Sequence, residues 1–481
     1  MSKERRMPRQ KRTSGKTGRR GESHDRSGTS ARVSRRRFLK NVAAASTAAV
    51  SAPYIVPATA LGLGGRPAPS ERIVMGCIGV GGRGTHNLHT FIEQKDVQIV
   101  AVCDVNKKSQ LYYRDRIRGR EPAKERVEAH YAQTGTTYEG CESFHDFRDL
   151  IAMKDIDVVS VATPDHWHAL ASIAALNAGK DVYCEKPLAN SVAEGRAICE
   201  AVEKNNRILQ TGSHERSNDN SRYAAELVLN GRIGKLHTVR IQMPCTEKHH
   251  QMVRDLKGTP PAEPLPEGMD FDFWLGHTPK VDYAMRRCHF WWRFILAHGG
   301  GEMTDRGAHV IDLAQMGMGA DRTGPVEIEA KGKRGDGLYD AFMEYEFTNT
   351  YANGVRMIGE SHSGTRGLKY EGSDGWIFVH VHGCKLDAGP KSLLDEIIGA
   401  KEIRLGRSPG HHRNFLDCVK TREQPLAPAE VGHRSGTICH LTNIAMLTGR
   451  KIKWDPKTET IAGDPGASDS LAPKMRAPWS L

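Results

Sequence analysis

The sequence contains ten cysteines among 481 residues, but no two of them stand at C-x-x-C spacing. This absence excludes the zinc-ribbon and thiol redox motifs that use such pairs. Cys77, Cys103 and Cys184 lie in or at the ends of apolar runs that read as buried strands, so we interpret them as small core residues. No internal repeat is apparent, and a chain of this length can form two or three domains with substantial cores.

Outside its first 40 residues the chain has no excess of either charge. Residues 1–40 hold 15 Lys and Arg against three Asp and Glu, and the resulting net charge of +12 equals that of the whole chain. The body is therefore neutral, and its composition does not predict nucleic acid as a partner.

The basic tail carries the pattern of an export signal. Ser34 to Lys40 read Ser-Arg-Arg-Arg-Phe-Leu-Lys, which matches the twin-arginine motif, and residues 41–60 are uncharged and end in Ala-Thr-Ala. Pro53 and Pro57 interrupt the weakly apolar stretch, so it predicts a cleaved signal peptide and no stable membrane span. A disordered basic arm would explain the charge but not this order of features. We expect the twin-arginine translocase as a partner and a periplasmic or otherwise extracytoplasmic protein.

The strongest motif lies between two strand-like runs. Residues 73–78 are apolar, Gly79, Gly81 and Gly84 fit G-x-G-x-x-G, and a second apolar run, 97–103, ends on Asp104. Such glycines allow a tight turn and the close approach of a pyrophosphate, which binds the N–H groups of the next helix. The acidic residue accepts hydrogen bonds from the adenine ribose and repels a 2′-phosphate. The motif predicts NAD as the cofactor, a preference that the neighbouring Arg83 weakens.

The rest of the first half alternates between helix and strand. We predict a helix over 107–126 in a polar segment, and then the rhythm of a doubly wound sheet, with strands at 158–162, 181–184 and 208–211 and helices at 144–153, 168–178 and 191–205. Ser191 and Glu194 form a capping box for the last helix. Thr163 to His168 follow a strand at its carboxyl end, where ligands bind in such sheets, so Thr163 and His168 are candidate cofactor contacts.

From about residue 212 the pattern changes. Short strands are predicted at 237–243, 326–331, 341–347, 355–361, 367–372 and 375–381, which suggests a largely antiparallel sheet. An aromatic stretch contains Trp292 and Arg293, and a glycine run precedes Asp305 and His309. Two further helices are predicted at 411–420 and 436–448.

Three motifs together resemble the Gfo/Idh/MocA oxidoreductases: the glycine turn, Glu185-Lys186-Pro187 after a strand, and the Asp305-to-His309 spacing after the glycine run. The resemblance covers about 72–455. It implies an α/β fold, with an N-terminal Rossmann doubly wound parallel sheet and a C-terminal α+β domain whose open sheet is mainly antiparallel. It also implies that Lys186, Asp305 and His309 surround the nicotinamide and the substrate hydroxyl.

These expectations divide the chain into a signal peptide (1–60), a linker (61–71), an NAD-binding domain (72–212), a substrate and oligomerisation domain (213–455) and a tail (456–481). A homo-oligomer is expected. The expected cofactor-binding residues are Gly79, Gly81, Gly82, Arg83, Gly84, Asp104, Thr163, His168, Glu185 and Lys186. Trp292, Arg293 and His411 are candidate substrate contacts.

The residue types suit the oxidation of an alcohol. Removal of a hydroxyl proton requires a base whose pKa lies near the working pH, and His309 is such a group. If the segment from Asp305 is helical, the two side chains share a face and the carboxylate can orient the imidazole. Lys186 would stabilise the alkoxide. A surface Asp–His contact is the plainer alternative. Asp305, His309 and Asp312 could also bind a metal, but no further ligand stands at a diagnostic spacing, so no metal is expected.

Export and a soluble cofactor conflict, because the extracytoplasmic space has no pool of NAD. We therefore expect a secondary-alcohol oxidoreductase for a sugar, polyol or glycoside, with tightly bound and recycled NAD. One alternative is an NAD-dependent glycoside hydrolase that works through transient oxidation at C3 and elimination. A second is a non-catalytic NAD- and carbohydrate-binding protein, which would not need the lysine, aspartate and histidine together.

Overall fold

The computed structural model describes residues 67–112, 116–133, 140–362, 364–383 and 385–481. The predicted signal peptide lies outside these ranges. Among the described residues, no helix has both the length and the apolar character that a membrane crossing needs.

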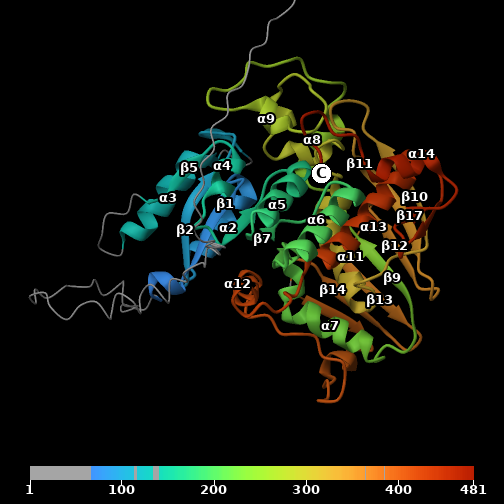
Figure 1. The fold of residues 1–481 in the computed structure, drawn as a ribbon. Helices are drawn as coiled ribbons and strands as arrows, with labels where there is room; N and C mark the ends of the chain where they lie inside the picture. Colours follow the sequence, from blue (N-terminus) through green and yellow to red (C-terminus); the bar gives the residue numbers. More distant parts are fainter. Residues whose placement is uncertain (1–66, 113–115, 134–139, 363, 384) are drawn as a thin grey trace, which may run out of the picture. The chain divides into compact units, whose positions relative to one another are not determined.

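A six-stranded parallel sheet forms the first part of the described chain (Figure 1). Its strands are β1 (Ile73–Ile78), β2 (Val97–Cys103), β5 (Glu142–Phe144), β6 (Val158–Val161), β7 (Asp181–Cys184) and β8 (Leu209–Thr211). They are ordered β5-β2-β1-β6-β7-β8, so the strand order reverses between β1 and β6. This is the arrangement of dinucleotide-binding sheets, which hold their ligand at the carboxyl ends of the two strands at the reversal.

Helices cover both faces of this sheet, which explains why its strands are continuous apolar runs. One buried cluster contains side chains of α2 (Gly82–Ile92), α3 (Arg120–Ala132) and α12 (His411–Thr421). The other contains side chains of α4 (Phe147–Ala152), α5 (His168–Asn177) and α6 (Val192–Asn205). The predicted N-cap of α6 is confirmed, because the Ser191 hydroxyl accepts from the Glu194 N–H at 3.2 Å.

The helix predicted over 107–126 is wrong in its first half. A hairpin of β3 (Ser109–Tyr112) and β4 (Arg116–Arg118) precedes α3. The Tyr112 ring packs against the glycine turn, where a Cβ added to Gly81 would lie 2.7 Å from it. Its centroid is also 4.5 Å from that of His289. These partners are distant in the sequence, and such tertiary contacts override local helix propensity.

The second sheet has nine strands and is mainly antiparallel, as predicted. Only β9 and β12 pair in parallel among its described pairs. In chain order its strands are β9 (Leu236–Gln242), β10 (Glu327–Arg334), β11 (Phe342–Thr350), β12 (Arg356–Glu360), β13 (Gly367–Gly372), β14 (Trp376–His380), β15 (Lys385–Gly389), β16 (Ile452–Asp455) and β17 (Thr460–Ile461).

Helices in contact with this sheet carry part of the site. They are α7 (Asp219–Leu229), α10 (Glu302–Asp305), α11 (Gly307–Gly317) and α13 (Ala429–Thr448). Three shorter helices complete the described chain: α8 (Lys248–Asp255), α9 (Phe271–Leu275) and α14 (Pro465–Ser468).

Helix α12 comes late in the chain, yet it completes the packing of the first sheet. The Phe415 ring lies 6.3 Å from that of Phe91 and 5.7 Å from that of Tyr183. Arg413 Nη1 lies 2.7 Å from Asp96 Oδ1. The side chains of α12 therefore pack with the NAD-binding layer, although the sequence placed this segment in the substrate domain.

A buried ion pair joins the segment after β8 to the second sheet's helices. Arg216 lies on the 3-10 helix η4 (His214–Ser217), and its Nε donates to Asp312 Oδ2 on α11 at 2.7 Å. The Ser435 hydroxyl donates to the other carboxylate oxygen at 2.8 Å. Both charged residues are almost fully buried. Arg216 also pairs with Asp321, but Asp312 has no other cation partner among the described residues, so its charge depends on Arg216 for compensation.

Replacing Arg216 with Met should therefore destabilise the fold strongly. The change leaves the Asp312 carboxylate buried without its cation, which typically costs about 3–5 kcal/mol. Arg240→Met is a matched control, because Arg240 pairs with Glu371 with half of its side chain exposed; an exposed pair contributes about 0–1 kcal/mol. Urea unfolding of the two variants measures the difference. Equal losses would contradict the assigned role of the buried pair.

Candidate active site

The carboxyl ends of β1 and β6 open into a cavity of about 690 Å³, a size typical of ligand sites. Residues of both sheets and their connecting loops line it. The predicted site residues among them are Gly79, Gly81, Gly82, Arg83, Asp104, Thr163, His168, Glu185, Lys186, Trp292, Arg293, Asp305 and His309. Gly84 and His411 do not line it.

The glycine turn has the shape that a dinucleotide requires. Gly79 has a φ of +77°, and a Cβ on it would lie 2.7 Å from the backbone that follows β6. A Cβ on Gly84 would lie 1.7 Å from the Gly79 carbonyl oxygen. Gly84 therefore allows the backbone of the turn to pack closely, and it does not line the cavity. A Cβ on Gly82 would meet no atom within 4 Å. The first turn of α2 has no acidic residue and no side-chain cap, which leaves its N–H groups available to an anion.

Asp104 lies at the end of β2, where the ribose of a dinucleotide is bound. Its two carboxylate oxygens accept from the backbone N–H groups of Val80 at 3.0 Å and Asn106 at 2.9 Å. Burial raises the pKa of Asp104 to about 6, although these hydrogen bonds oppose the shift. The carboxylate is thus held in place, and its charge changes within an accessible pH range.

Glu185 anchors the segment that carries Lys186. Its Oε1 accepts from Arg83 Nε at 2.8 Å and from Asn87 Nδ2 at 2.9 Å. Burial alone would raise the pKa of Glu185, but the Arg83 charge and these hydrogen bonds hold it at about 2. Arg83 is therefore partnered by a protein carboxylate.

His168 holds the same segment from the other side. Its ring nitrogens lie 2.7 Å from the Pro187 carbonyl oxygen and 3.0 Å from that of Thr163. The histidine thus ties the loop after β7 to the loop after β6.

Lys186 and Asp305 form the central ion pair of the cavity. Lys186 Nζ donates to Asp305 Oδ1 at 2.7 Å and to its carbonyl oxygen at 2.6 Å. Burial favours the neutral acid, but the charges of Lys186 and Arg293 hold the pKa of Asp305 well below its usual value. The expectation that Asp305 orients His309 is wrong, because the helix breaks at Arg306 between α10 and α11 and the carboxylate turns to Lys186 instead.

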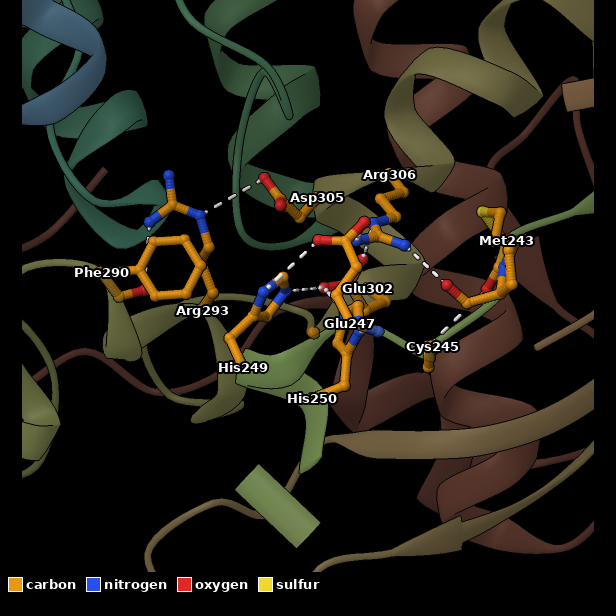
Figure 2. A network of polar contacts seen from close by, with 12 residues as sticks. Met243, Cys245, Glu247, His249, His250, Phe290, Arg293, Glu302, Asp305 and Arg306 are labelled. Carbon is orange, nitrogen blue, oxygen red and sulfur yellow. Dashed lines mark hydrogen bonds and ion pairs between the residues drawn. The ribbon is translucent and has the colours of Figure 1, made fainter. Parts of the chain in front are cut away.

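A second polar network fixes α10 (Figure 2). The buried Glu302 carboxylate accepts from His250 Nε2 at 2.8 Å and pairs with Arg306 Nε at 2.6 Å. Arg306 Nη2 also donates to Glu247 at 2.7 Å. Burial would raise the pKa of Glu302, but the histidine and arginine contacts hold it at about 2. Because Glu302 and Asp305 share one short helix, this network also holds Asp305 in place.

His309 stands among histidines rather than beside a carboxylate. Its ring centroid lies 4.7 Å from that of His214 and 4.9 Å from that of His382. His309 is buried, and its Nδ1 has no hydrogen-bond partner among the described residues. Burial and then the Lys186 charge lower the pKa of His309 well below its usual value. The ring is therefore neutral, and its pKa lies further from the working pH than we expected from the sequence for a general base.

The three candidate substrate residues have different surroundings. The Arg293 guanidinium lies 4.4 Å from the Trp292 ring centroid and 3.5 Å from Asp305 Oδ1, so both residues belong to the wall beside the ion pair. His411 instead uses its ring nitrogens on the Thr211 carbonyl at 2.9 Å and the Ser217 hydroxyl at 2.9 Å. It packs inside the protein, and the prediction that it contacts substrate is wrong.

His214 and His382 are two histidines of the cavity lining that the sequence did not predict. His214 follows β8, and the rule that ligands bind at carboxyl ends of parallel strands could have found it. His382 follows β14 in the second sheet, and no local signal marks it. The metal set considered from sequence does not assemble, because Asp312 pairs with Arg216.

A glycine turn shaped for a dinucleotide, an acid at the ribose position and a lysine–aspartate pair lie in one cavity, which is the arrangement typical of nicotinamide-dependent oxidoreductases. Family comparisons agree. Residues 73–213 match the NAD-binding Rossmann-fold model of the Gfo/Idh/MocA oxidoreductases, and residues 221–481 match the C-terminal alpha/beta domain model of that family. The chain belongs to this family.

Individual relatives are more distant. The inositol 2-dehydrogenase of Salmonella typhimurium is 32% identical over 165 residues, which is 33% of this chain and 42% of that one. A glycosyl hydrolase family 109 protein of Shewanella sp. is 29% identical over 187 residues, or 36% of this chain and 37% of that one. The match spans about two-fifths of the length of either relative.

Solved structures share the fold. The aldose-aldose oxidoreductase of Caulobacter crescentus superimposes with a TM-score of 0.54 at 19% identity, over 79% of this chain and 99% of the other. The WlbA dehydrogenase of Bordetella pertussis, solved with NADH and UDP-GlcNAcA, gives a TM-score of 0.55 at 17% identity, over 80% and 99%.

The surroundings of Asp104 predict a pH-dependent choice of cofactor. Above a pKa of about 6 the carboxylate is ionised and repels the 2′-phosphate of NADP. As the pH falls through 6 the repulsion disappears, so the ratio of the NADP to the NAD dissociation constant should decrease. Fluorescence titrations at high and low pH measure this ratio.

Asp104→Asn is the control. Its ratio of the NADP to the NAD dissociation constant should already be small at high pH, and any remaining pH dependence of this ratio should come from titration of the 2′-phosphate of NADP. Tighter binding of NADP than NAD by the wild type at high pH would contradict the assignment.

Proposed function

We propose that this chain oxidises a secondary hydroxyl of a sugar, polyol or glycoside with a tightly held NAD. The observation that carries the proposal is that Lys186, Asp305 and His309 line the same cavity as the glycine turn. A carbohydrate substrate is supported by the similarity to an inositol dehydrogenase and to family 109 glycosyl hydrolases.

In this reaction NAD supplies the acceptor for the hydride that leaves the substrate carbon. The protein has to receive the hydroxyl proton and stabilise the charge left on the oxygen. His309 lines the cavity and is the residue we assign to take the proton. Lys186 stabilises the oxygen, and the electrostatic effect of such a preorganised charge increases where water is excluded. Asp305 keeps Lys186 charged and oriented.

A redox-neutral glycoside hydrolase is the second candidate. Oxidation at C3 acidifies the hydrogen on C2, the aglycone leaves by elimination, water adds to the double bond, and the returned hydride restores the C3 hydroxyl. The sequence similarity to family 109 favours it. The same lysine and histidine serve both candidates, so product analysis with a glycoside separates them: a released aglycone indicates the hydrolase, and a ketosugar indicates the dehydrogenase.

The proposed division of roles predicts the effects of three substitutions. Lys186→Ala and His309→Ala should each lower kcat for alcohol oxidation by at least about a hundredfold while NAD still binds, because both act on the transition state. Asp305→Asn should resemble Lys186→Ala, since the structure pairs it with the lysine. Lys369→Ala, which removes a lysine paired with Glu371 outside the cavity, is the control. Near-normal turnover of His309→Ala on a substrate that the wild type oxidises would contradict its role.

We also propose export of the folded enzyme with its cofactor. The twin-arginine motif supports this, because that pathway carries folded proteins and can move bound NAD. Replacing Arg35 and Arg36 with Lys should keep the protein in the cytoplasm. Fractionation followed by mass spectrometry should find the wild type in the periplasm, beginning near Leu61 and carrying nicotinamide. Normal export of the double variant would refute the proposal and remove the reason to expect a recycled cofactor.

A further inference from the structure

We propose that His214, His309 and His382 form a binding site for a divalent transition-metal ion of the zinc type, with an open coordination position facing the cavity. The three side chains come from η4, from α11 and from the turn after β14. Each can offer one ring nitrogen, and these three nitrogens all lie within 4.8 Å of one another. Three imidazoles plus one exchangeable ligand is the arrangement of catalytic zinc sites.

Two ring nitrogens of the cluster are unpaired among the described residues. His214 Nδ1 and His309 Nδ1 are both buried, and neither has a hydrogen-bond partner among the described residues. A buried polar atom without a partner loses its interaction with water, and a bound cation would restore an interaction for both. His382 has two long contacts, 3.4 Å from Nδ1 to Arg366 Nη1 and 3.7 Å from Nε2 to Glu215 Oε1. It can give up either of them at small cost.

Glu215 supplies the support that metal-binding histidines usually have. Its carboxylate is buried and lies 3.3 Å from His214 Nε2, on the opposite side of the ring from the free Nδ1. A carboxylate that accepts from the far nitrogen of a ligating histidine fixes the tautomer and increases the basicity of the ligand. The same oxygen faces His382, so one carboxylate supports two of the three histidines.

The surrounding charges permit a cation. Lys186 is neutralised by Asp305 at 2.7 Å, and Arg366 is neutralised by Glu247 at 2.7 Å. Glu215 pairs with no lysine or arginine among the described residues, so its negative charge remains to offset the ion.

A second histidine cluster provides a contrast within the same cavity wall. Glu247, His249 and His250 are also close enough to hold an ion. However, His250 Nδ1 accepts from the Glu247 N–H at 3.0 Å and its Nε2 lies 2.8 Å from Glu302 (Figure 2). Both nitrogens are already used, and Glu302 and Glu247 are paired with Arg306. That cluster is a structural network. In the cluster of His214, His309 and His382, by contrast, the Nδ1 atoms of His214 and His309 have no partner among the described residues.

The role of the ion rests on the proposed function. A substrate hydroxyl at the open position would have its pKa lowered by the cation, as bound water has in zinc enzymes. Because a ligated His309 could not also accept the hydroxyl proton, that proton would pass to water in the metal-loaded chain, whereas His309 is the base in the metal-free chain. The C–H bond would still break with its electron pair going to the nicotinamide. The binding site itself can be tested without turnover.

The test measures metal content and affinity directly. The full chain is dialysed against Zn²⁺ and then against metal-free buffer, and retained zinc is counted by mass spectrometry. We expect one ion per wild-type chain, and loss of retention in His214→Gln and in His382→Gln. Glu215→Gln should weaken zinc binding by about ten- to a hundredfold. His362→Gln, which alters an exposed histidine outside the cluster, should retain the ion.

Further measurements keep the outcomes separate. NAD titration of each variant confirms that it is folded, and the visible spectrum of the Co²⁺-loaded chain should change when a polyol substrate is added. No retained metal in the wild type, or retention by the two histidine variants equal to that of the wild type, would overturn the site. Retained metal in a chain that oxidises no alcohol would preserve the site and refute the proposed function.

Discussion

The contact between Lys186 and Asp305 is the interaction on which the geometry of the cavity depends. It joins the loop after β7 in the parallel sheet to α10 beside the second sheet, through both the carboxylate and the backbone carbonyl of one residue. Loss of Asp305 would leave the Lys186 charge unpaired in a partly buried place, and loss of Lys186 would leave the Asp305 carboxylate with Arg293 alone at 3.5 Å; either change costs more than the net gain from the pair. The pair therefore specifies position more than it supplies stability.

Two polar networks keep this pair where it is. On one side, Glu185 binds Arg83 and Asn87 from α2, so the lysine loop is tied to the helix that follows the glycine turn. On the other side, Glu302 gathers two histidines and Arg306 around α10. Both carboxylates are held ionised by adjacent cations despite burial. Burial, and after it nearby cations, lower the pKa values of His309 and His382 beside the pair.

The sequence predicted the features that depend on short-range interactions and missed those that depend on contacts between distant parts of the chain. The glycine turn, the acid after β2 and the Ser191 cap depend on neighbours within a few residues, and all three lie where the local pattern placed them. The helix expected over 107–126 failed because Tyr112 packs against Gly81 and His289. Likewise, the spacing from Asp305 to His309 suggested a contact between their side chains. Instead, the Asp305 carboxylate accepts a hydrogen bond from Lys186, which lies 119 positions away in the sequence. His382 joins the site only through the topology of the second sheet.

Helix α12 has a consequence for the order in which this protein can mature. Its side chains Phe415 and Leu416 complete the apolar core under β1 and β2, and its ion pair reaches Asp96. During synthesis the first 400 residues therefore emerge before the NAD-binding layer can close over one of its faces. Domains usually fold as units from the N-terminus, but here the first domain stays incomplete until α12 has been synthesised. We therefore expect stable capture of the cofactor only after α12 has been synthesised.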